Sequence, residues 1–397
     1  MNCKEIPVPV EYQDICPFSD EVFAAQMAKL VTEPGFKHAV TYVMPDVDFD
    51  QFCKGLLKIK DKHDFQLNVM YPFLQLIEKK TTAGVTGGGL ENVEDDTPHV
   101  YITNHRDIVL DASFLNINLI RKDLPTTEIA IGNNLLIYDW IEGLVRLNKS
   151  FIVKRDGNRR QTFEAAHHLS GYIHFAINEK KQSIWIAQRE GRTKDSDDRT
   201  QDSLIKMLAM GGMTGGRDLV TGLKEINLAP VSISYELDPN DYLKAKEFLM
   251  RSKDANFKKS QRDDLFSMET GILQYKGHVH FQFAKCINDE LDKIPADLDK
   301  AEVVRAICEI IDRSIHLNYK IYPCNYISHD LLMNDTRFAD NYTQADKDSF
   351  LGYVESQLAK VDIPVNEEDK EFMRRMILTM YSNPLTNYLV AKAHTAE

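Results

Sequence analysis

Cysteines are few in this sequence, and no two of them are close together. The six are Cys3, Cys16, Cys53, Cys286, Cys308 and Cys324, and none forms a Cys-x-x-Cys pair. Such sparse thiols argue against a disulfide framework and fit the reduced cysteines of a cytosolic protein. The first residues are partly acidic and contain no sustained apolar run, so we expect neither a signal peptide nor a transit peptide.

Long apolar runs are also missing. The most apolar window extends from Asn133 to Leu147 and is interrupted by Asp139 and Glu142. It is shorter than the roughly 20 apolar residues that a membrane-spanning helix needs. Any membrane contact is therefore expected to be peripheral, and the expected location is the cytoplasm and the inner face of the cell membrane.

Positive charge is in deficit. The chain has 48 Lys and Arg against 60 Asp and Glu, a formal net charge of -12 that argues against a nucleic-acid partner. The same charge opposes adhesion to an anionic membrane unless basic residues gather on one face. The 397 residues are 43% hydrophobic, with 19 Gly and 14 Pro, which predicts a globular protein and excludes the fibrous and disordered classes.

The first third of the chain has the pattern of packing helices. Phe23, Met27 and Leu30 stand at i, i+4 and i+7, and a second apolar run extends from Phe65 to Ile77. The glycine-rich, acidic segment from Lys79 to Pro98 predicts a connector. It lacks the preceding strand and the Lys-Ser or Lys-Thr pair that a phosphate loop requires.

From His99 onward, short apolar segments alternate with helical patterns, which predicts an α/β domain. The strand-like segments are HVYITN, TEIAIGN, SFIVK, SIWIA and LAPVSISYE, followed further on by residues 277–283 and 318–327. Helices are expected over 163–177, 240–257, 301–318, 346–360 and 366–381. The expected division is a helical N-terminal region and linker (1–97), an α/β core (98–285) and a helical C-terminal region (286–397).

His105 follows directly on a predicted strand, in the segment VYITNHRDIVLD. Side chains beyond the carboxyl ends of parallel strands line a crevice, so His105 is the best-placed candidate general base. Asp107 and Asp111 are near it in sequence, and a carboxylate partner fixes the tautomer of a histidine and stabilises its cation. The alternative is a surface loop in which Asp107 caps the next helix.

Two basic clusters also follow predicted strands. They comprise Lys154, Arg155, Arg159 and Arg160 after the first strand, and Arg189, Glu190, Gly191, Arg192 and Lys194 after the second. Guanidinium groups bind phosphate oxygens in pairs, and glycine lets the backbone approach a ligand closely. The clusters predict a pocket for an anionic substrate, with solvated charged loops as the alternative.

Taken in order, four blocks resemble the glycerolipid acyltransferase family: NHRDIVLD (104–111), FIVKRD (151–156), REGRTKD (189–195) and LAPVSISYE (228–236). The resemblance covers about residues 98–240. It implies an α/β fold, with a mixed sheet flanked by helices and helical regions at both ends. It also implies O-acyl transfer from acyl-carrier protein or acyl-CoA to a hydroxyl of a glycerol phosphate or lysophospholipid, in membrane lipid biosynthesis.

In that family the histidine of the first block is the general base, a role that falls here on His105. The expected substrate-binding residues, from the resemblance and the basic clusters, are Asn104, Arg106, Lys154, Arg155, Arg189, Glu190, Gly191, Arg192, Lys194 and Pro230, with Pro230 in the pocket wall. The thioester is already activated, so no metal and no cofactor beyond the acyl donor is expected. The expected partners are the acyl-carrier protein or CoA thioester and a lipid acceptor, and the sequence indicates no oligomeric state.

The sequence departs from the family in two spacings. The family has four residues between the histidine and its aspartate, whereas five separate His105 from Asp111, and Leu110 fills the family position. Six steps of an ideal helix turn the side chain by roughly 600°, so the two cannot share a helix face. Either His105 lies in a non-helical turn and pairs with Asp111, which we favour, or Asp107 takes the role. In the third block, the family has one further residue between its glycine and its arginine, whereas here Arg192 follows Gly191 directly. This difference leaves Arg192, Arg189 and Lys194 as alternative ligands of the acceptor's anion.

The altered spacings admit other acceptors, such as an acylated amino acid. A non-catalytic lipid-binding relative is the main rival, and a serine hydrolase is disfavoured because no Gly-x-Ser-x-Gly elbow occurs. The stretch from Leu135 to Leu147 is either an acyl groove, a lipid-docking element or a core helix. Residues 244–262 contain seven Lys or Arg and form the candidate patch for lipid or carrier protein, with a solvated helix as the alternative.

Overall fold

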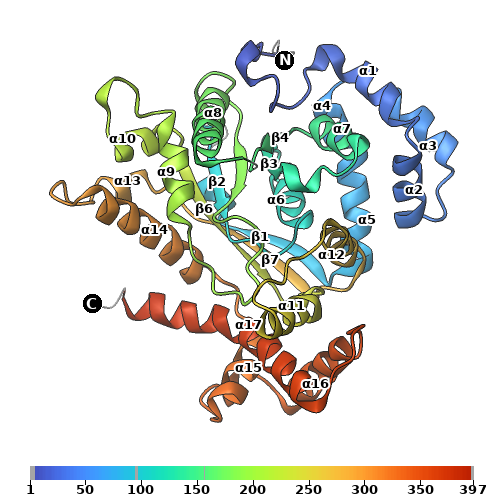
Figure 1. Cartoon of the computed structure of the whole chain (residues 1–397), viewed down its shortest axis with the longest axis vertical. Coiled ribbons are helices and arrows are strands. Elements are labelled where there is room, and N and C mark those ends of the chain that lie inside the picture. The colour runs from blue at the N-terminus through green and yellow to red at the C-terminus, as the bar shows by residue number, and fades with distance from the viewer. Residues whose placement is uncertain (1–4, 94–96, 156, 395–397) are drawn as a thin grey trace.

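The computed structural model of the chain describes residues 5–93, 97–155 and 157–394. These residues form a mixed β-sheet with helices on both faces and further helices at both ends of the chain (Figure 1). The α/β fold expected from the alternating pattern is thereby confirmed. Cys3 lies outside the described residues.

Seven strands make up the sheet, in the order β1-β7-β6-β2-β5-β3-β4. Their bounds are β1 Gly84–Gly88, β2 Val100–Thr103, β3 Glu128–Gly132, β4 Ser150–Val153, β5 Ile184–Ala187, β6 Leu228–Tyr235 and β7 His278–Phe283. β2 to β6 run parallel, while β7 is antiparallel to β6 and parallel to β1. The carboxyl ends of β2 to β6 therefore meet at one edge of the sheet.

All six strand-like segments from 99 to 283 are strands, but two other expectations are wrong. The connector expected over 79–98 includes β1, whose glycines gave no strand signal. Directly after β1, a Cβ at Gly89 would lie 2.0 Å from the backbone carbonyl oxygen of Phe283, so the chain leaving β1 needs glycine to fit beside β7. The strand expected over 318–327 is partly helix α15 (Pro323–Met333), because Pro323 at the first helical position favours a helix start.

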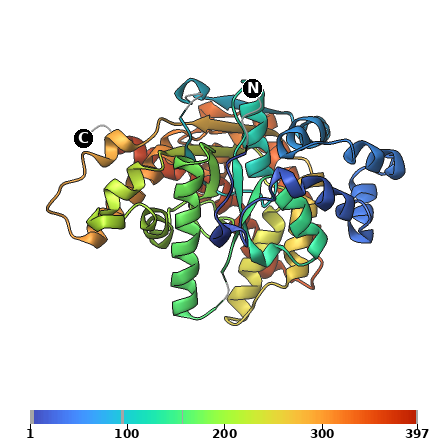
Figure 2. The ribbon, with the colours of Figure 1, turned by 90° about the horizontal axis from the view of Figure 1, so that it is seen from above.

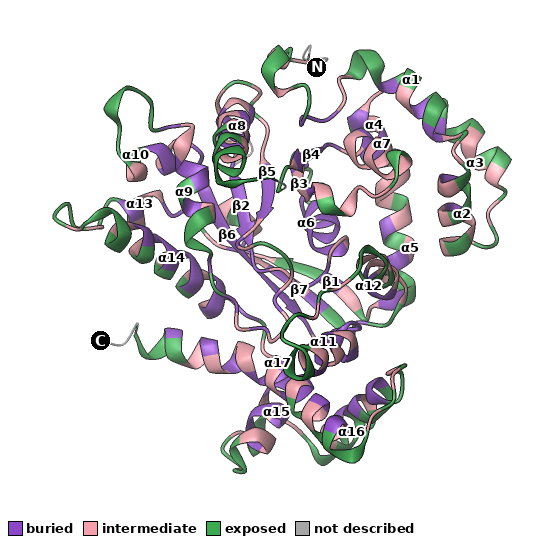
Figure 3. Cartoon of the chain, in the orientation of Figure 1, coloured by how far each residue is buried: buried purple, intermediate pink, exposed green. Residues whose placement is uncertain are grey.

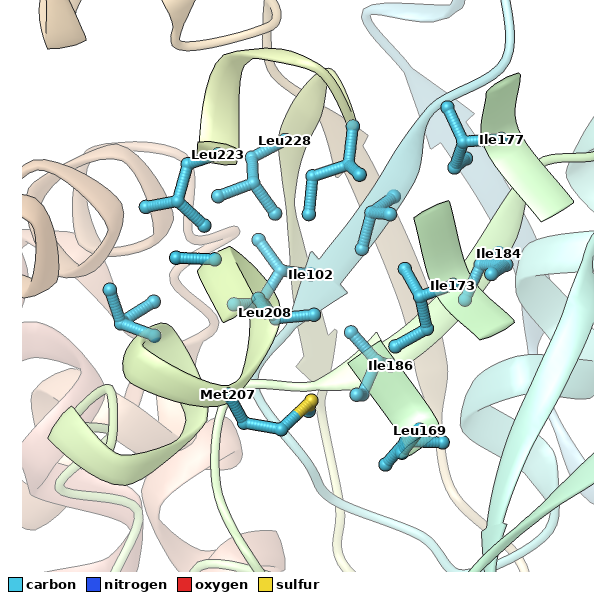
Figure 4. Packing of buried hydrophobic residues seen from close by; sticks show 14 of the residues in the cluster. Ile102, Leu169, Ile173, Ile177, Ile184, Ile186, Met207, Leu208, Leu223 and Leu228 are labelled. Atoms are coloured by element: carbon cyan, nitrogen blue, oxygen red, sulfur yellow. The ribbon is translucent and has the colours of Figure 1, made fainter. Parts of the chain in front are cut away.

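Helices cover both faces of the sheet. On one face lie α8 (Arg159–Asn178), α9 (Asp202–Met210), α10 (Leu219–Lys224), α13 (Asn288–Leu291) and α14 (Lys300–Leu317); on the other lie α5 (Tyr71–Thr81) and α6 (Leu110–Ile120). Alternate side chains of each strand serve the two faces: Ile184 and Ile186 join the first core and Trp185 the second. Figure 4 shows the packing of the first core.

The N-terminal helices form a separate cluster, to which α7 also contributes. They are α1 (Asp20–Leu30), α2 (Pro34–Val43), α3 (Phe49–Leu56), α4 (Lys62–Phe65) and α7 (Asp139–Leu147). Phe23, Met27 and Leu30 are buried in this cluster, as their spacing predicted, and Leu147 packs with them. In Figure 1, α1 to α3 lie at the edge of the molecule next to α7.

The remaining helices follow β6 along the chain. They are α11 (Asp241–Lys253), α12 (Gln261–Leu273), α15, α16 (Gln344–Leu358) and α17 (Glu367–Ala393). α17 continues past the predicted end at residue 381 although Pro384 lies inside it. Figure 3 shows that the buried residues are concentrated on the sheet and on parts of the helices that pack around it. Among the described residues, none of the helices combines the length and the apolarity that crossing a membrane requires.

Candidate active site

His105 lies beside Asp111 in the turn between β2 and α6. β2 ends at Thr103 and α6 begins at Leu110, so His105 is in a non-helical segment. Its Nδ1 lies 2.9 Å from Oδ2 of Asp111. The Asp111 side chain is fully buried, whereas 12% of the His105 side chain is exposed. The pair thus lies where the interior meets the open edge of the sheet.

The Asp111 carboxylate also accepts two backbone hydrogen bonds. The N–H groups of Arg106 and Asp107 donate to Oδ2 at 2.6 and 3.0 Å. A carboxylate fixed in this way accepts from His105, so Nδ1 carries the proton and Nε2 keeps the lone pair. His105 is therefore oriented as a base whose reactive nitrogen is Nε2.

Asp107 contacts the backbone at the start of α6, unlike Asp111, which contacts His105. Its Oδ1 accepts from the backbone N–H groups of Val109 and Leu110 at 2.9 and 2.8 Å, which caps the start of α6. Burial, together with the charge of Asp111, raises the pKa of Asp107. Its Oδ2 packs against α12, where a Cβ on Gly271 would lie 1.9 Å away. Of the two partners that the sequence left open, Asp111 is the one that contacts His105.

A cavity of about 530 Å³ opens beside His105, at the carboxyl ends of β3, β4 and β5. Its volume is within the range of small-molecule sites, roughly 300–1,000 Å³. Its polar lining includes His105, Lys154, Arg155, Arg189, Glu190, Gly191, Arg192 and Lys194, and its apolar lining includes Ile131, Leu135, Val153, Leu169, Ile186 and Met207. Figure 4 shows Leu169, Ile186 and Met207 together in the core packing, so the apolar wall continues into the core.

The cations of the cavity differ in their partners. Arg155 Nη1 lies 3.3 Å from Oε1 of Glu190, and Lys194 Nζ lies 2.5 Å from Oε1 of Glu247. In contrast, Nη1 of Arg192 is buried and has no hydrogen-bond partner among the residues that the structure describes. Arg192 therefore holds a donor that is available to an anion in the cavity.

Gly191 adopts a left-handed backbone conformation with φ 68°. Residues with a Cβ rarely adopt this conformation, so the turn between Glu190 and Arg192 favours glycine. Apart from its two chain neighbours, no described residue has an atom within 4 Å of the position that a Cβ would take, so the backbone there is open. The glycine shapes the loop that carries Arg192.

Five of the predicted residues do not line the cavity. They are Asn104, Arg106, Asp107, Asp111 and Pro230. Asn104 and Arg106 were expected to contact substrate, but both are buried and contact Asp198. Pro230 was expected in the pocket wall; it lies within β6, opposite Ile102 of β2. Successive side chains of a strand point to opposite sides. The sequence alone therefore does not show which residues in or next to a strand face the cavity.

Five of the seven cations in the basic segment 244–262, the candidate patch for lipid or carrier protein, form ion pairs with carboxylates. The pairs are Lys244 with Asp238, Lys246 with Asp362, Arg251 with Glu247, Lys253 with Asp369 and Lys259 with Asp264. Lys244 is 3% exposed, and burial lowers its pKa. Lys244, Glu247 and Lys259 instead line the cavity, a contribution that the sequence pattern did not indicate.

The two ends of the stretch Leu135–Leu147 have different surroundings. Leu135 lines the cavity, whereas α7 packs through Leu147 against the N-terminal helices. α7 is thus a partly buried member of the N-terminal cluster, in which Leu147 is its buried residue.

Comparison with known proteins decides the class of this site. Residues 84–234 match the model of the Acyltransferase family. The chain contains an acyltransferase domain. The matched segment runs from β1 into β6 and contains His105, Asp111 and the Arg192 loop. The expectation of an acyltransferase enzyme is confirmed by this match.

The acyltransferase is also similar to the solved structure of the 1-acyl-sn-glycerophosphate acyltransferase PlsC from Thermotoga maritima. The TM-score is 0.36 and the sequence identity 10%, over 75% of this chain and 94% of that one. A comparison with curated proteins found no match. The assignment of the acyltransferase therefore rests on the family match of residues 84–234.

Proposed function

We propose that this acyltransferase moves a fatty acyl group from the thioester of acyl-carrier protein or CoA to a hydroxyl of a glycerol phosphate or a 1-acylglycerol-3-phosphate-like lysophospholipid. The observation that carries the proposal is the His105–Asp111 pair at a cavity that offers both cations and an apolar wall. Cations bind the phosphate of an acceptor, and an apolar wall accommodates a fatty acyl chain.

The chemistry follows from the orientation of His105. Its Nε2 takes the proton of the acceptor hydroxyl as the oxygen attacks the thioester carbonyl. The tetrahedral intermediate then breaks its C–S bond, and the imidazolium returns the proton to the leaving thiolate. Asp111 holds the required tautomer and stabilises the imidazolium, as the partner carboxylate does in other histidine-based acyl transfer. The products are an ester and a free thiol.

Arg192 is the proposed ligand of the acceptor's phosphate. Its Nη1 is buried and finds no partner in the part of the chain that the structure describes, whereas Lys194 and Arg155 are engaged with carboxylates. A buried donor without an acceptor costs free energy, and an anionic oxygen would remove that cost. Arg189 also lines the cavity and is the second candidate donor.

Arg192→Gln is expected to raise the KM for glycerol 3-phosphate or lysophosphatidate by about 10- to 100-fold, because a charge-assisted hydrogen bond contributes about 1.5–3 kcal/mol. Steady-state kinetics with phosphorylated acceptors and with an uncharged acylated acceptor would measure this. Arg217→Gln is the control, since Arg217 pairs with Glu225 outside the cavity lining. A KM that rises equally for phosphorylated and uncharged acceptors would contradict the assignment of Arg192. Transfer only to an acylated amino acid would show that this compound, and not a phosphorylated one, is the acceptor.

We further propose that the cavity faces a membrane at the inner surface of the cell. Phe163 near the start of α8 is 60% exposed and Phe266 on α12 is 47% exposed. Their helices also supply Thr162 and Asp264 to the cavity lining. The start of α8 and the loop before α12 reach the same side of the molecule (Figure 2). Exposed aromatic side chains beside a cavity mouth fit a peripheral contact with lipid.

Phe163→Glu is expected to weaken binding to phospholipid vesicles at least about tenfold, because burying a phenylalanine side chain contributes roughly 1.5–3 kcal/mol. Vesicle sedimentation would measure the bound fraction. Met333→Glu is the matched control, since Met333 is 57% exposed at the end of α15 and is not in the cavity lining. Equal loss in both variants, or no loss in Phe163→Glu, would refute this orientation.

A further inference from the structure

Asp198 is a fully buried carboxylate between β5 and α9, at the end of the acidic segment 195–198. Its Oδ2 lies 2.6 Å from Nη2 of Arg106, and its Oδ1 lies 3.4 Å from Nη1 of the same residue. Asn104 Nδ2 also donates to Oδ2, at 3.3 Å. The residues on both sides of His105 are therefore bound to one carboxylate on the neighbouring loop.

The C-terminal region contacts the same residue. The hydroxyl of Tyr319, just beyond α14, donates to the Asp198 carboxylate. Burial and the charge of Asp198 raise the pKa of Tyr319 well above its usual value, so it stays a donor. His316 of α14 donates from Nε2 to the backbone carbonyl of Asp198 at 2.8 Å. Burial lowers the pKa of His316, which keeps it neutral with one N–H to donate.

Two backbone bonds join the same pair of loops. The N–H of Thr193 donates to the carbonyl of His105 at 3.2 Å, and the N–H of Gln188 donates to the carbonyl of Thr103 at 2.7 Å. The N–H of Arg106 is in turn one of the donors to Asp111. The position of Arg106 therefore influences both the carboxylate that orients His105 and the loop that carries Arg192.

From these contacts we infer that Asp198 is a positioning residue that fixes His105 relative to the Arg192 loop, and that Asn104 and Arg106 are its partners. The inference rests on the proposed function for its kinetic consequence. Burial alone would lower the pKa of the Arg106 guanidinium, but Asp198 and other carboxylates raise it, so the pair is charged in the interior. A buried charge pair is sensitive to loss of one partner, which gives the contact a measurable effect.

Helix α17 holds the same loop from a second direction. Asn383 Nδ2 donates to the carbonyl of Asp195 at 2.8 Å, and Asn387 Nδ2 donates to Oδ1 of Asp197 at 3.2 Å. The C-terminal helices thus act as a scaffold for the residues that follow Arg192 and Lys194, which assigns a role to a region for which the sequence indicated none.

Asp198→Asn is expected to lower kcat by about 10²-fold while the KM for the acceptor changes less than about threefold, because small displacements of a catalytic group reduce the rate strongly. Asp312→Asn is the matched control: Asp312 is also buried and binds Thr200 on the same segment, but it has no contact with residues 104–106 among its hydrogen bonds. Tyr319→Phe removes a single donor to Asp198 and is the milder variant if Asp198→Asn folds poorly.

Hydrogen exchange of the wild type and the three variants provides a readout that does not require activity. Faster exchange at residues 104–107 and 189–194 in Asp198→Asn and Tyr319→Phe, but not in Asp312→Asn, is the expected result. Unchanged exchange in both, or equal effects of Asp312→Asn, would overturn the inference. If the wild type transfers no acyl group but exchange changes as expected, the proposed function fails while the positioning by Asp198 stands.

Discussion

Replacing His105 with alanine is expected to lower kcat by about 10³- to 10⁴-fold with little change in the free energy of unfolding. The expected loss is the contribution of a positioned general base, roughly 10²–10⁴-fold, at the upper end because Asp111 orients the imidazole. The stability effect is small because the side chain is at the cavity surface and its main partner, Asp111, keeps two backbone donors. Stopped assays of ester formation from a labelled thioester would measure the rate.

A matched control is His168→Ala. His168 Nε2 lies 3.0 Å from Oδ1 of Asp14, so this variant also breaks a histidine–aspartate pair, but His168 does not line the cavity. We expect its kcat to be that of the wild type. If His105→Ala retained more than about a tenth of the wild-type rate, or if both variants lost activity equally, His105 would not be the base.

The second large effect is expected for Asp111→Asn. His105 Nδ1 and the backbone N–H groups of Arg106 and Asp107 all contact the same oxygen, Oδ2. If the asparagine places its NH2 group there, the wrong histidine tautomer is favoured and two buried backbone donors lose their acceptor. If it keeps its oxygen there, the charge that stabilises the imidazolium is lost, and the NH2 group takes the buried Oδ1 position, for which the described residues offer no hydrogen-bond partner. We expect kcat to fall on the order of 10³-fold and the unfolding free energy to fall by about 1–3 kcal/mol.

The control for this variant is Asp330→Asn. Asp330 is also a buried carboxylate that accepts from a backbone N–H, that of Phe338, but it lies on α15 and does not line the cavity. Denaturant unfolding of both variants, together with kcat per folded molecule, separates the two effects. We expect both proteins to be destabilised and only Asp111→Asn to lose activity. Equal activity of the two variants would remove Asp111 from the mechanism.

Local sequence patterns predicted most of the sheet. Apolar segments such as 100–103 and 184–187 are β2 and β5 because alternate residues serve the two faces, one facing α8 and the other α6. β1 was missed because its glycines carry no apolar side chains; its place depends on pairing with β7, where Gly88 lies opposite Gln282. That contact joins residues nearly two hundred positions apart in sequence.

The candidate site was predictable where it depends on local spacing. The helix geometry required His105 to lie in a turn if Asp111 is its partner, and the structure has this arrangement. The roles of Arg106 and Lys244 were not predictable, because their partners, Asp198 and Asp238, are acidic residues that look solvated in the sequence. The net charge of -12 is likewise a whole-chain average, whereas the cavity is lined by five Lys and Arg from residues 154 to 194.

The central claim is acyl transfer to a phosphate-bearing hydroxyl acceptor, and one assay tests it most directly. Purified full-length protein would be incubated with a labelled acyl-carrier protein or acyl-CoA and with glycerol 3-phosphate, lysophosphatidate or an acylated amino acid, in the presence of phospholipid vesicles. Mass spectrometry of the extracted lipids would identify the product. We predict an acylated phosphate-bearing lipid in the wild-type reaction and almost none with His105→Ala. No acylated product from any acceptor, or equal product from the variant, would contradict the account.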